Sequence, residues 1–241
     1  MRVLHGVILE EESCCTIRLL AGKPVQEGPL TRVPVELRST QGARKKGSTE
    51  AETLHVRGEV ILAVRLPEPD AGPPDFSLYP YPRNQAEIYA QLLFHGPDLQ
   101  GIETVEGCSK RGIVGFVAGA PAPTEWIDRP LRNTWLADPL VIDSAIQLMV
   151  LWTFENMGRA SLPCFVGSYR QYRRSVPSGG VRVVVEVKQS TEHRAIADIF
   201  FLDSEGKVVA RMENYESVID PGLNQAFRRN RLSQPVSIGL V

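Results

Sequence analysis

The feature that most constrains the fold is a long apolar run from Pro139 to Met157. Pro139 suits the first position of a helix, Asp138 suits the N-cap before it, and Gly158 is a natural stop. Apolar side chains face almost every direction around this predicted helix, which is typical of a helix that is buried on all sides. The run is too short and too polar to span a membrane. We therefore predict a central helix wrapped by other elements.

Two polar residues, Asp143 and Gln147, interrupt the apolar run four positions apart, so they share one face of the predicted helix. A carboxylate in apolar surroundings is costly unless it is paired or has a chemical role. The alternative is that Asp143 only interacts with the dipole at the helix N-terminus. Its spacing to Gln147 within a buried helix favours a functional site, and we predict that these two residues form the chemical centre of the chain.

Composition excludes several classes of function. The 241 residues are 43% hydrophobic and carry a formal net charge of −1. This length allows one large domain or two small fused ones, and the near-neutral charge does not favour nucleic acid or an anionic membrane as a partner. The start of the sequence lacks the apolar core of a signal peptide, and there is no transmembrane run, so we expect a cytoplasmic protein. The four cysteines and four histidines are too scattered for a metal motif or a disulfide framework.

The chain divides into two parts of different character. Residues 1–66 contain short β-branched runs and no helical pattern, so we predict strands only. These predicted strands are 3–9, 15–20, 31–37 and 54–64, with a polar loop at 39–49. An antiparallel sheet of this kind needs an element that covers its apolar face. Residues 67–82 are rich in proline and predict a stiff, extended linker.

The second part, residues 83–222, begins with a short predicted helix that Asn84 caps, with Glu87 at the capping-box position. Two strands, at 102–106 and 111–118, precede the apolar helix. Four strands, at 164–173, 180–188, 194–202 and 207–219, follow it, and residues 203–206 form a hairpin turn. One long helix with antiparallel strands around it predicts an α+β hot-dog fold. The tail, 223–241, shows no clear element and predicts a linker or a partly disordered segment.

Two motifs carry a resemblance to a known family. The run Asp143-Ser-Ala-Ile-Gln147, with Pro139 ahead of it, and the turn Phe94-His-Gly-Pro-Asp-Leu-Gln-Gly101 are similar to motifs of the dehydratase domains of polyketide and polyunsaturated-fatty-acid synthases. The segment 168–174 also resembles the latter branch, whereas Leu99 replaces a usual aromatic residue. The resemblance implies a double hot-dog whose second sheet wraps the central helix.

The resemblance also implies an activity. Such a lyase removes water from a 3-hydroxyacyl chain to give a trans-2-enoyl thioester. The substrate is carried on the phosphopantetheine of an acyl carrier protein, and no further cofactor is implied. Asp143 would be the acid that protonates the leaving hydroxyl, and Gln147 would orient it. His95, Gly96, Pro97 and Tyr169 would line the substrate channel. The implied partners are the carrier protein, neighbouring synthase domains and a second copy of the chain.

One departure from the family is large. Its second catalytic residue is a histidine in a His-x-x-x-Gly-x-x-x-x-Pro motif on the first hot-dog, and no histidine of this sequence fits that pattern. Residues 1–66 also lack the first central helix. Three explanations are open: either the reading frame starts late, or another polypeptide supplies the missing part, or the domain is degenerate. We expect weak or no activity from this chain alone. The alternatives are a non-catalytic acyl-binding or scaffold module and a product-template-like domain.

Overall fold

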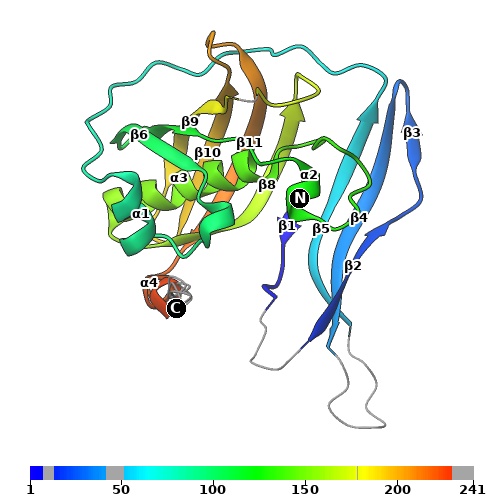
Figure 1. The fold of residues 1–241 in the computed structure, drawn as a ribbon, viewed down its shortest axis with the longest axis horizontal. Coiled ribbons are helices and arrows are strands. Elements are labelled where there is room, and N and C mark those ends of the chain that lie inside the picture. Colours follow the sequence, from blue (N-terminus) through cyan, green and yellow to red (C-terminus); the bar gives the residue numbers. More distant parts are fainter. Residues whose placement is uncertain (8–13, 42–51, 178, 230–241) are drawn as a thin grey trace, which may run out of the picture.

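The computed structural model describes residues 1–7, 14–41, 52–177 and 179–229. Within them, eleven strands form one antiparallel sheet with the order β2-β4-β5-β1-β8-β11-β10-β9-β7-β6, and β3 pairs with β4 beside this path (Figure 1). The strands are β1 (Arg2–Val3), β2 (Cys15–Ala21), β3 (Val25–Glu27), β4 (Leu30–Gln41), β5 (Glu52–Ala63), β6 (Ile102–Ser109), β7 (Gly112–Val117), β8 (Ser161–Gln171), β9 (Val181–Ser190), β10 (Arg194–Leu202) and β11 (Val208–Ile219). The helices are α1 (Gln85–Gln91), the 3₁₀ turn η1 (Pro97–Leu99), α2 (Pro123–Trp126), α3 (Pro139–Met157) and α4 (Pro221–Arg229).

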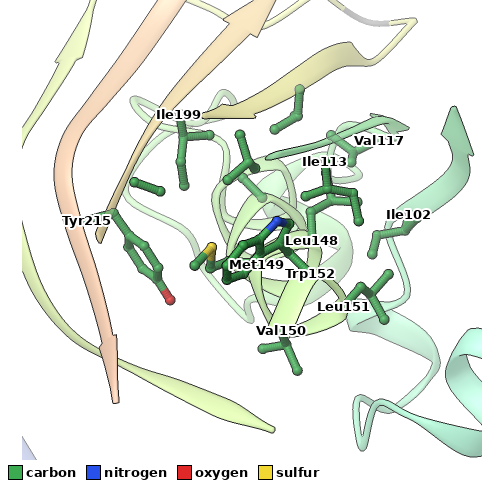
Figure 2. Close-up of a cluster of buried hydrophobic side chains, with 14 of the residues drawn as sticks. Ile102, Ile113, Val117, Leu148, Met149, Val150, Leu151, Trp152, Ile199 and Tyr215 are labelled. Atoms are coloured by element: carbon green, nitrogen blue, oxygen red, sulfur yellow. The ribbon is translucent and has the colours of Figure 1, made fainter. Parts of the chain in front are cut away.

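The central helix α3 is confirmed with the boundaries that the sequence predicts. The side chain of Asp138 accepts a hydrogen bond from the backbone N–H of Val141, and Gly158 ends the helix with a left-handed φ of 66°. Strands β6 to β11 curve around α3, and Figure 2 shows Leu148 and Trp152 among side chains from these strands. Both side chains are almost completely buried. No helix in the described part of the chain is long and apolar enough to cross a membrane.

The described part of the first half forms strands and no helix, as predicted, and these strands extend the sheet of the second half. Strand β1 pairs with β5 on one side and with β8 on the other, so the two predicted sheets join at their edges. The strand predicted at 3–9 is wrong for residues 4–7, because β1 ends at Val3 and the N–H groups of Leu4 and His5 both point to the carbonyl of His55; residues 8 and 9 lie outside the described residues. The predicted loop at 39–49 lies mainly outside the described residues, and its first residues continue β4.

One face of this extension is apolar. The register pairs Leu19 of β2 with Leu37 of β4, and Leu62 of β5 with Thr31 of β4, which places these residues on one side of the sheet because side chains alternate. The apolar residues of this face include Ile17, Leu19, Val33, Val35, Leu37, Val56, Val60 and Leu62. Leu19 is 75% exposed and Leu62 is 53% exposed.

The structure of the segment that leads into the second half agrees with the prediction from the sequence. Residues 67–82 run without a helix from β5 to α1, and Tyr79 forms one bridge to Cys108. Asn84 caps α1, and the reciprocal bond from its backbone N–H to Glu87 completes a capping box. This cap fixes the start of α1 and thus the position of the turn that follows it.

The prediction for the start of the tail was wrong. Residues 221–229 form helix α4 instead of an irregular segment. The helix begins at Pro221, and the preceding Asp220 accepts a hydrogen bond from the N–H of Gly222. Phe227 is buried against the rings of Phe94 and Phe154, which gives this mostly polar helix an anchor. The rest of the tail lies outside the described residues.

Candidate active site

Asp143 lies in the second turn of α3, with its side chain 34% exposed. It is therefore less deeply buried than the surrounding apolar run suggested. Its Oδ2 atom accepts a hydrogen bond of 2.7 Å from Nε2 of Gln147, one helical turn later. The prediction that the two side chains act together is consistent with this contact. Their catalytic roles remain a proposal.

Gln147 is completely buried, and its amide is fully engaged. Its Nε2 also donates to the backbone carbonyl of Leu99 at 2.7 Å, and its Oε1 accepts from the hydroxyl of Tyr89 at 2.8 Å. The oxygen of Tyr89 in turn accepts a 2.9 Å hydrogen bond from the backbone N–H of Ile102. A continuous polar chain therefore runs from strand β6 through α1 to Asp143 in α3.

His95 reaches the same carboxylate from the turn after α1. Its Nε2 lies 3.6 Å from Oδ2 of Asp143, which is too long for a hydrogen bond. The imidazole is 10% exposed and stacks on Phe94 at 4.4 Å between ring centroids. Burial lowers the pKa of His95, although the carboxylate of Asp143 opposes that change. His95 is therefore neutral near pH 7.

The two nitrogens of His95 have different environments. Nδ1 is buried and has no hydrogen-bond partner among the described residues, whereas Nε2 faces Asp143. The tautomer with its hydrogen on Nε2 avoids burying an unpaired N–H group. This tautomer directs a weakly attractive N–H toward Oδ2 and leaves the lone pair of Nδ1 inside the protein.

Gly96 and Pro97 shape the turn that presents these groups. Gly96 caps η1 in an extended conformation, and Pro97 occupies the first position of that turn. The turn aims the carbonyl of Leu99 at Gln147. Gly101 then passes so close to α3 that a Cβ atom at this position would meet Ser144 and Leu140. The turn thus sets the spacing between His95 and α3.

Tyr169 of β8 is not joined to Asp143 by a hydrogen bond. Its hydroxyl is buried without a hydrogen-bond partner among the described residues, and its ring packs edge-on against Phe201 at 6.0 Å. Burial raises the pKa of this hydroxyl, so it stays protonated. An unpaired buried hydroxyl is compatible with the substrate contact predicted for Tyr169, which remains a prediction.

Sequence reasoning missed Tyr89. Its position on the inner face of a short amphipathic helix indicates a core aromatic residue, and nothing local shows that its hydroxyl reaches Gln147 in another helix. The described residues include no group of three or more His, Cys, Asp and Glu side chains that is placed to hold a metal ion. The chemistry that these side chains themselves offer is proton transfer and hydrogen bonding.

Comparison with known proteins identifies the family. A family model described as the polyketide synthase dehydratase N-terminal domain matches residues 67–219. The chain belongs to this dehydratase family. A curated relative, one of the subunits of a polyunsaturated fatty acid synthase from Thraustochytrium sp. (strain ATCC 26185 / S-3), is 29% identical over 174 residues. The match covers 71% of this chain and only 6% of that relative.

Solved structures of dehydratases share the fold. The dehydratase domain from the CurH module of curacin polyketide synthase gives a TM-score of 0.66 at 18% identity, covering 94% of this chain and 77% of that one. Two inactive mutants of the CurK dehydratase, with a histidine changed to phenylalanine or an aspartate changed to asparagine, give TM-scores of 0.61 and 0.62 at 20% and 17% identity. The matches cover 91% of this chain and 73% and 72% of theirs. The predicted double hot-dog fold and the dehydratase family are thereby confirmed.

Proposed function

We propose that this dehydratase-family domain supplies the acid half of a site that removes water from a 3-hydroxyacyl thioester. The observation that carries the proposal is the carboxyl group of Asp143, partly exposed and held by the fully buried Gln147 near the start of the central helix. A hydroxyl group is a poor leaving group unless it is protonated as it departs. Asp143 is placed to provide that proton.

The reaction needs one acid and one base. The base removes the α-proton, which the thioester carbonyl acidifies, and the electron pair forms the double bond as the C3–O bond breaks. The neutral acid form of Asp143 gives its proton to the departing oxygen, so that water and the trans-2-enoyl thioester are released. Positive potential at the N-terminus of α3 stabilises negative charge that develops near the carboxyl or the thioester oxygen.

His95 does not suit the role of base. Its Nε2 faces Asp143, and its remaining nitrogen, Nδ1, is buried without a hydrogen-bond partner among the described residues. The other described histidines do not contact Asp143 or Gln147. His55, for example, contacts Ser39 and the backbone of His5 in the first half of the sheet. The inactivity of the CurK mutant that lacks a histidine supports the need for such a base. We therefore propose that this chain alone is a weak or inactive dehydratase.

The partners follow from the substrate and from the exposed apolar face. We propose that the acyl chain arrives on the phosphopantetheine of an acyl carrier protein, within a synthase that contains further domains. We also propose that an adjoining part of that synthase covers the face that includes Leu19 and Leu62. The solved dehydratase chains support this proposal, because they are longer than the part that this chain matches. A second copy of the chain is the competing occupant.

A second candidate function is a non-catalytic module that binds acyl chains or holds synthase domains together. The absence from this sequence of a histidine in the family motif favours it. Both candidates use the same fold, and they differ in whether Asp143 transfers a proton.

Single-turnover dehydration of a 3-hydroxyacyl carrier-protein thioester separates the two candidates. Mass spectrometry follows the loss of water in the wild type, in Asp143→Asn and in Asp128→Asn, a control at a highly exposed carboxylate. Slow turnover that disappears only in Asp143→Asn supports the dehydratase. Turnover that persists in Asp143→Asn contradicts it, and no turnover in any of the chains favours the binding module.

A further inference from the structure

We propose that Tyr89 is a positioning residue that fixes the Gln147 amide, so that Oδ2 of Asp143 is always an acceptor and Oδ1 carries the acid proton. This inference rests on the proposed function of Asp143 as the acid, and it assigns the proton to one of the two carboxyl oxygens. It also gives Tyr89, which lies outside the motifs of the sequence, a defined part in the site.

The direction of the polar chain is set by its first donor. The backbone N–H of Ile102 can only donate, so the oxygen of Tyr89 accepts from it at 2.9 Å. The single hydroxyl hydrogen of Tyr89 is then free to point at Oε1 of Gln147, 2.8 Å away. Burial raises the pKa of Tyr89, so this hydroxyl keeps its hydrogen.

The orientation of the Gln147 amide follows from two independent contacts. Tyr89 donates to one end, which must therefore be the oxygen. The carbonyl of Leu99 can only accept, so the other end, 2.7 Å from it, must be the nitrogen. A flipped amide would place two acceptors together at Leu99. The second hydrogen of Nε2 then points at Oδ2 of Asp143, 2.7 Å away.

The proton of Asp143 is placed by elimination. Oδ2 receives the N–H of Gln147 and faces Nε2 of His95, so a hydrogen on Oδ2 would meet these donors. Among the described residues, the hydrogen bonds of this carboxyl group involve Oδ2 and leave Oδ1 open. The neutral acid therefore presents its hydrogen on Oδ1, which is free to meet a substrate hydroxyl.

A purely structural role for Tyr89 is the competing explanation, because its ring is buried in the core. The variant Tyr89→Phe separates the two roles, since it keeps the ring and removes only the hydroxyl. The matched control is Tyr215→Phe, at a fully buried tyrosine whose hydroxyl has no hydrogen-bond partner among the described residues.

The experiment records the side-chain amide signals of Gln147 by NMR in chains labelled with ¹⁵N-glutamine, together with single-turnover dehydration. In the wild type, both amide hydrogens should exchange with solvent at least about tenfold more slowly than those of the exposed Gln189, since both are donated inside the protein. Tyr89→Phe should reduce this protection, because the amide is held at one end fewer, and should lower the turnover rate about tenfold at unchanged substrate affinity, the effect of one lost hydrogen bond. Tyr215→Phe should change neither quantity.

Two results would overturn the proposal. In the first, the amide hydrogens of Gln147 in the wild type exchange as fast as those of Gln189. This result can be obtained even if Tyr89→Phe does not fold. The other is full protection of Gln147 in a folded Tyr89→Phe chain. If protection is reduced in Tyr89→Phe while Asp143→Asn dehydrates the substrate as fast as the wild type, the positioning by Tyr89 stands and the proposed dehydratase function fails.

Discussion

Nε2 of His95 lies 3.6 Å from Oδ2 of Asp143, although the two residues belong to separate elements. The contact brings a neutral imidazole, held by the turn after α1, against the carboxyl group of the central helix. It also turns one nitrogen of His95 into the protein and the other toward Asp143. The pair is therefore arranged to hold the acid in place, and a base for the reaction has to come from elsewhere.

The first prediction concerns pH. Burial lowers the pKa of His95 in the folded chain below its ordinary value of about 6.5, so the folded chain binds fewer protons than the unfolded chain just below that pH. The contribution of His95 to stability is then fully present above about pH 6.5, the pKa of the unfolded chain. It is lost as the pH falls from there through the lower pKa of the folded chain. Urea unfolding across pH 5 to 8, in the wild type and in His95→Gln, should show a smaller loss on the acid side in the variant. Equal losses in both chains would contradict the neutral, buried state of His95.

The second prediction concerns the buried amide. Gln147→Leu should leave the buried Tyr89 hydroxyl without its acceptor and the partly buried Leu99 carbonyl without its donor. An unpaired buried group such as the Tyr89 hydroxyl costs roughly 1–3 kcal/mol of unfolding free energy. Chemical denaturation measures the loss, and the exposed Gln189→Leu should change stability by no more than about 0.5 kcal/mol. If the Gln147→Leu variant is as stable as the control, the hydrogen bonds of the Gln147 amide contribute little to the stability of the fold.

A third prediction concerns Gly101. Gly101→Ala should destabilise the fold by about 1–3 kcal/mol, because the added methyl group meets Ser144 and Leu140 of α3. The same change at Gly72, which has open space around its Cβ position, is the control. Thermal or urea unfolding gives both values, and a harmless Gly101→Ala would mean that the turn can move away from α3 without cost.

A fourth prediction concerns the exposed apolar face. Leu19→Lys combined with Leu62→Lys should reduce self-association of the isolated chain, because two charges interrupt a contiguous apolar surface. Light scattering against concentration measures this. If the wild type is a single monomeric species without added partner, the proposal that this face needs a cover is wrong. A stable wild-type dimer that the two lysines dissociate would identify a second copy as the occupant.

Much of the fold can be predicted from local patterns. Asp138, Asn84 and Gly158 mark helix ends through their immediate neighbours, and the sequence therefore predicts α3 and the start of α1 correctly. Helix α4 escaped prediction because its short sequence is mostly polar and its anchor, Phe227, packs against residues far away in the chain. Local patterns identify elements that stabilise themselves and miss those that depend on distant contacts.

The candidate site, too, is predicted from the sequence only where its contacts are local. The spacing of Asp143 and Gln147 predicts their contact, because both lie on one helix. The hydrogen bond from Tyr89 to Gln147 and the approach of His95 to Asp143 join residues that only the tertiary fold brings together. Motif and spacing therefore indicate the acid, whereas the residues that orient it appear only in the structure.

The most direct test of the central claim is a crystal structure of the Asp143→Asn chain with a 3-hydroxyacyl pantetheine thioester bound. The variant keeps the size and shape of the carboxyl group while it removes the acid, so the substrate remains intact. Our account predicts that the 3-hydroxyl group lies within hydrogen-bond distance of the substituted side chain, at the atom that takes the place of Oδ1, on the side away from Gln147. A hydroxyl group bound elsewhere, with no contact to this side chain, would contradict the assignment of Asp143 as the acid.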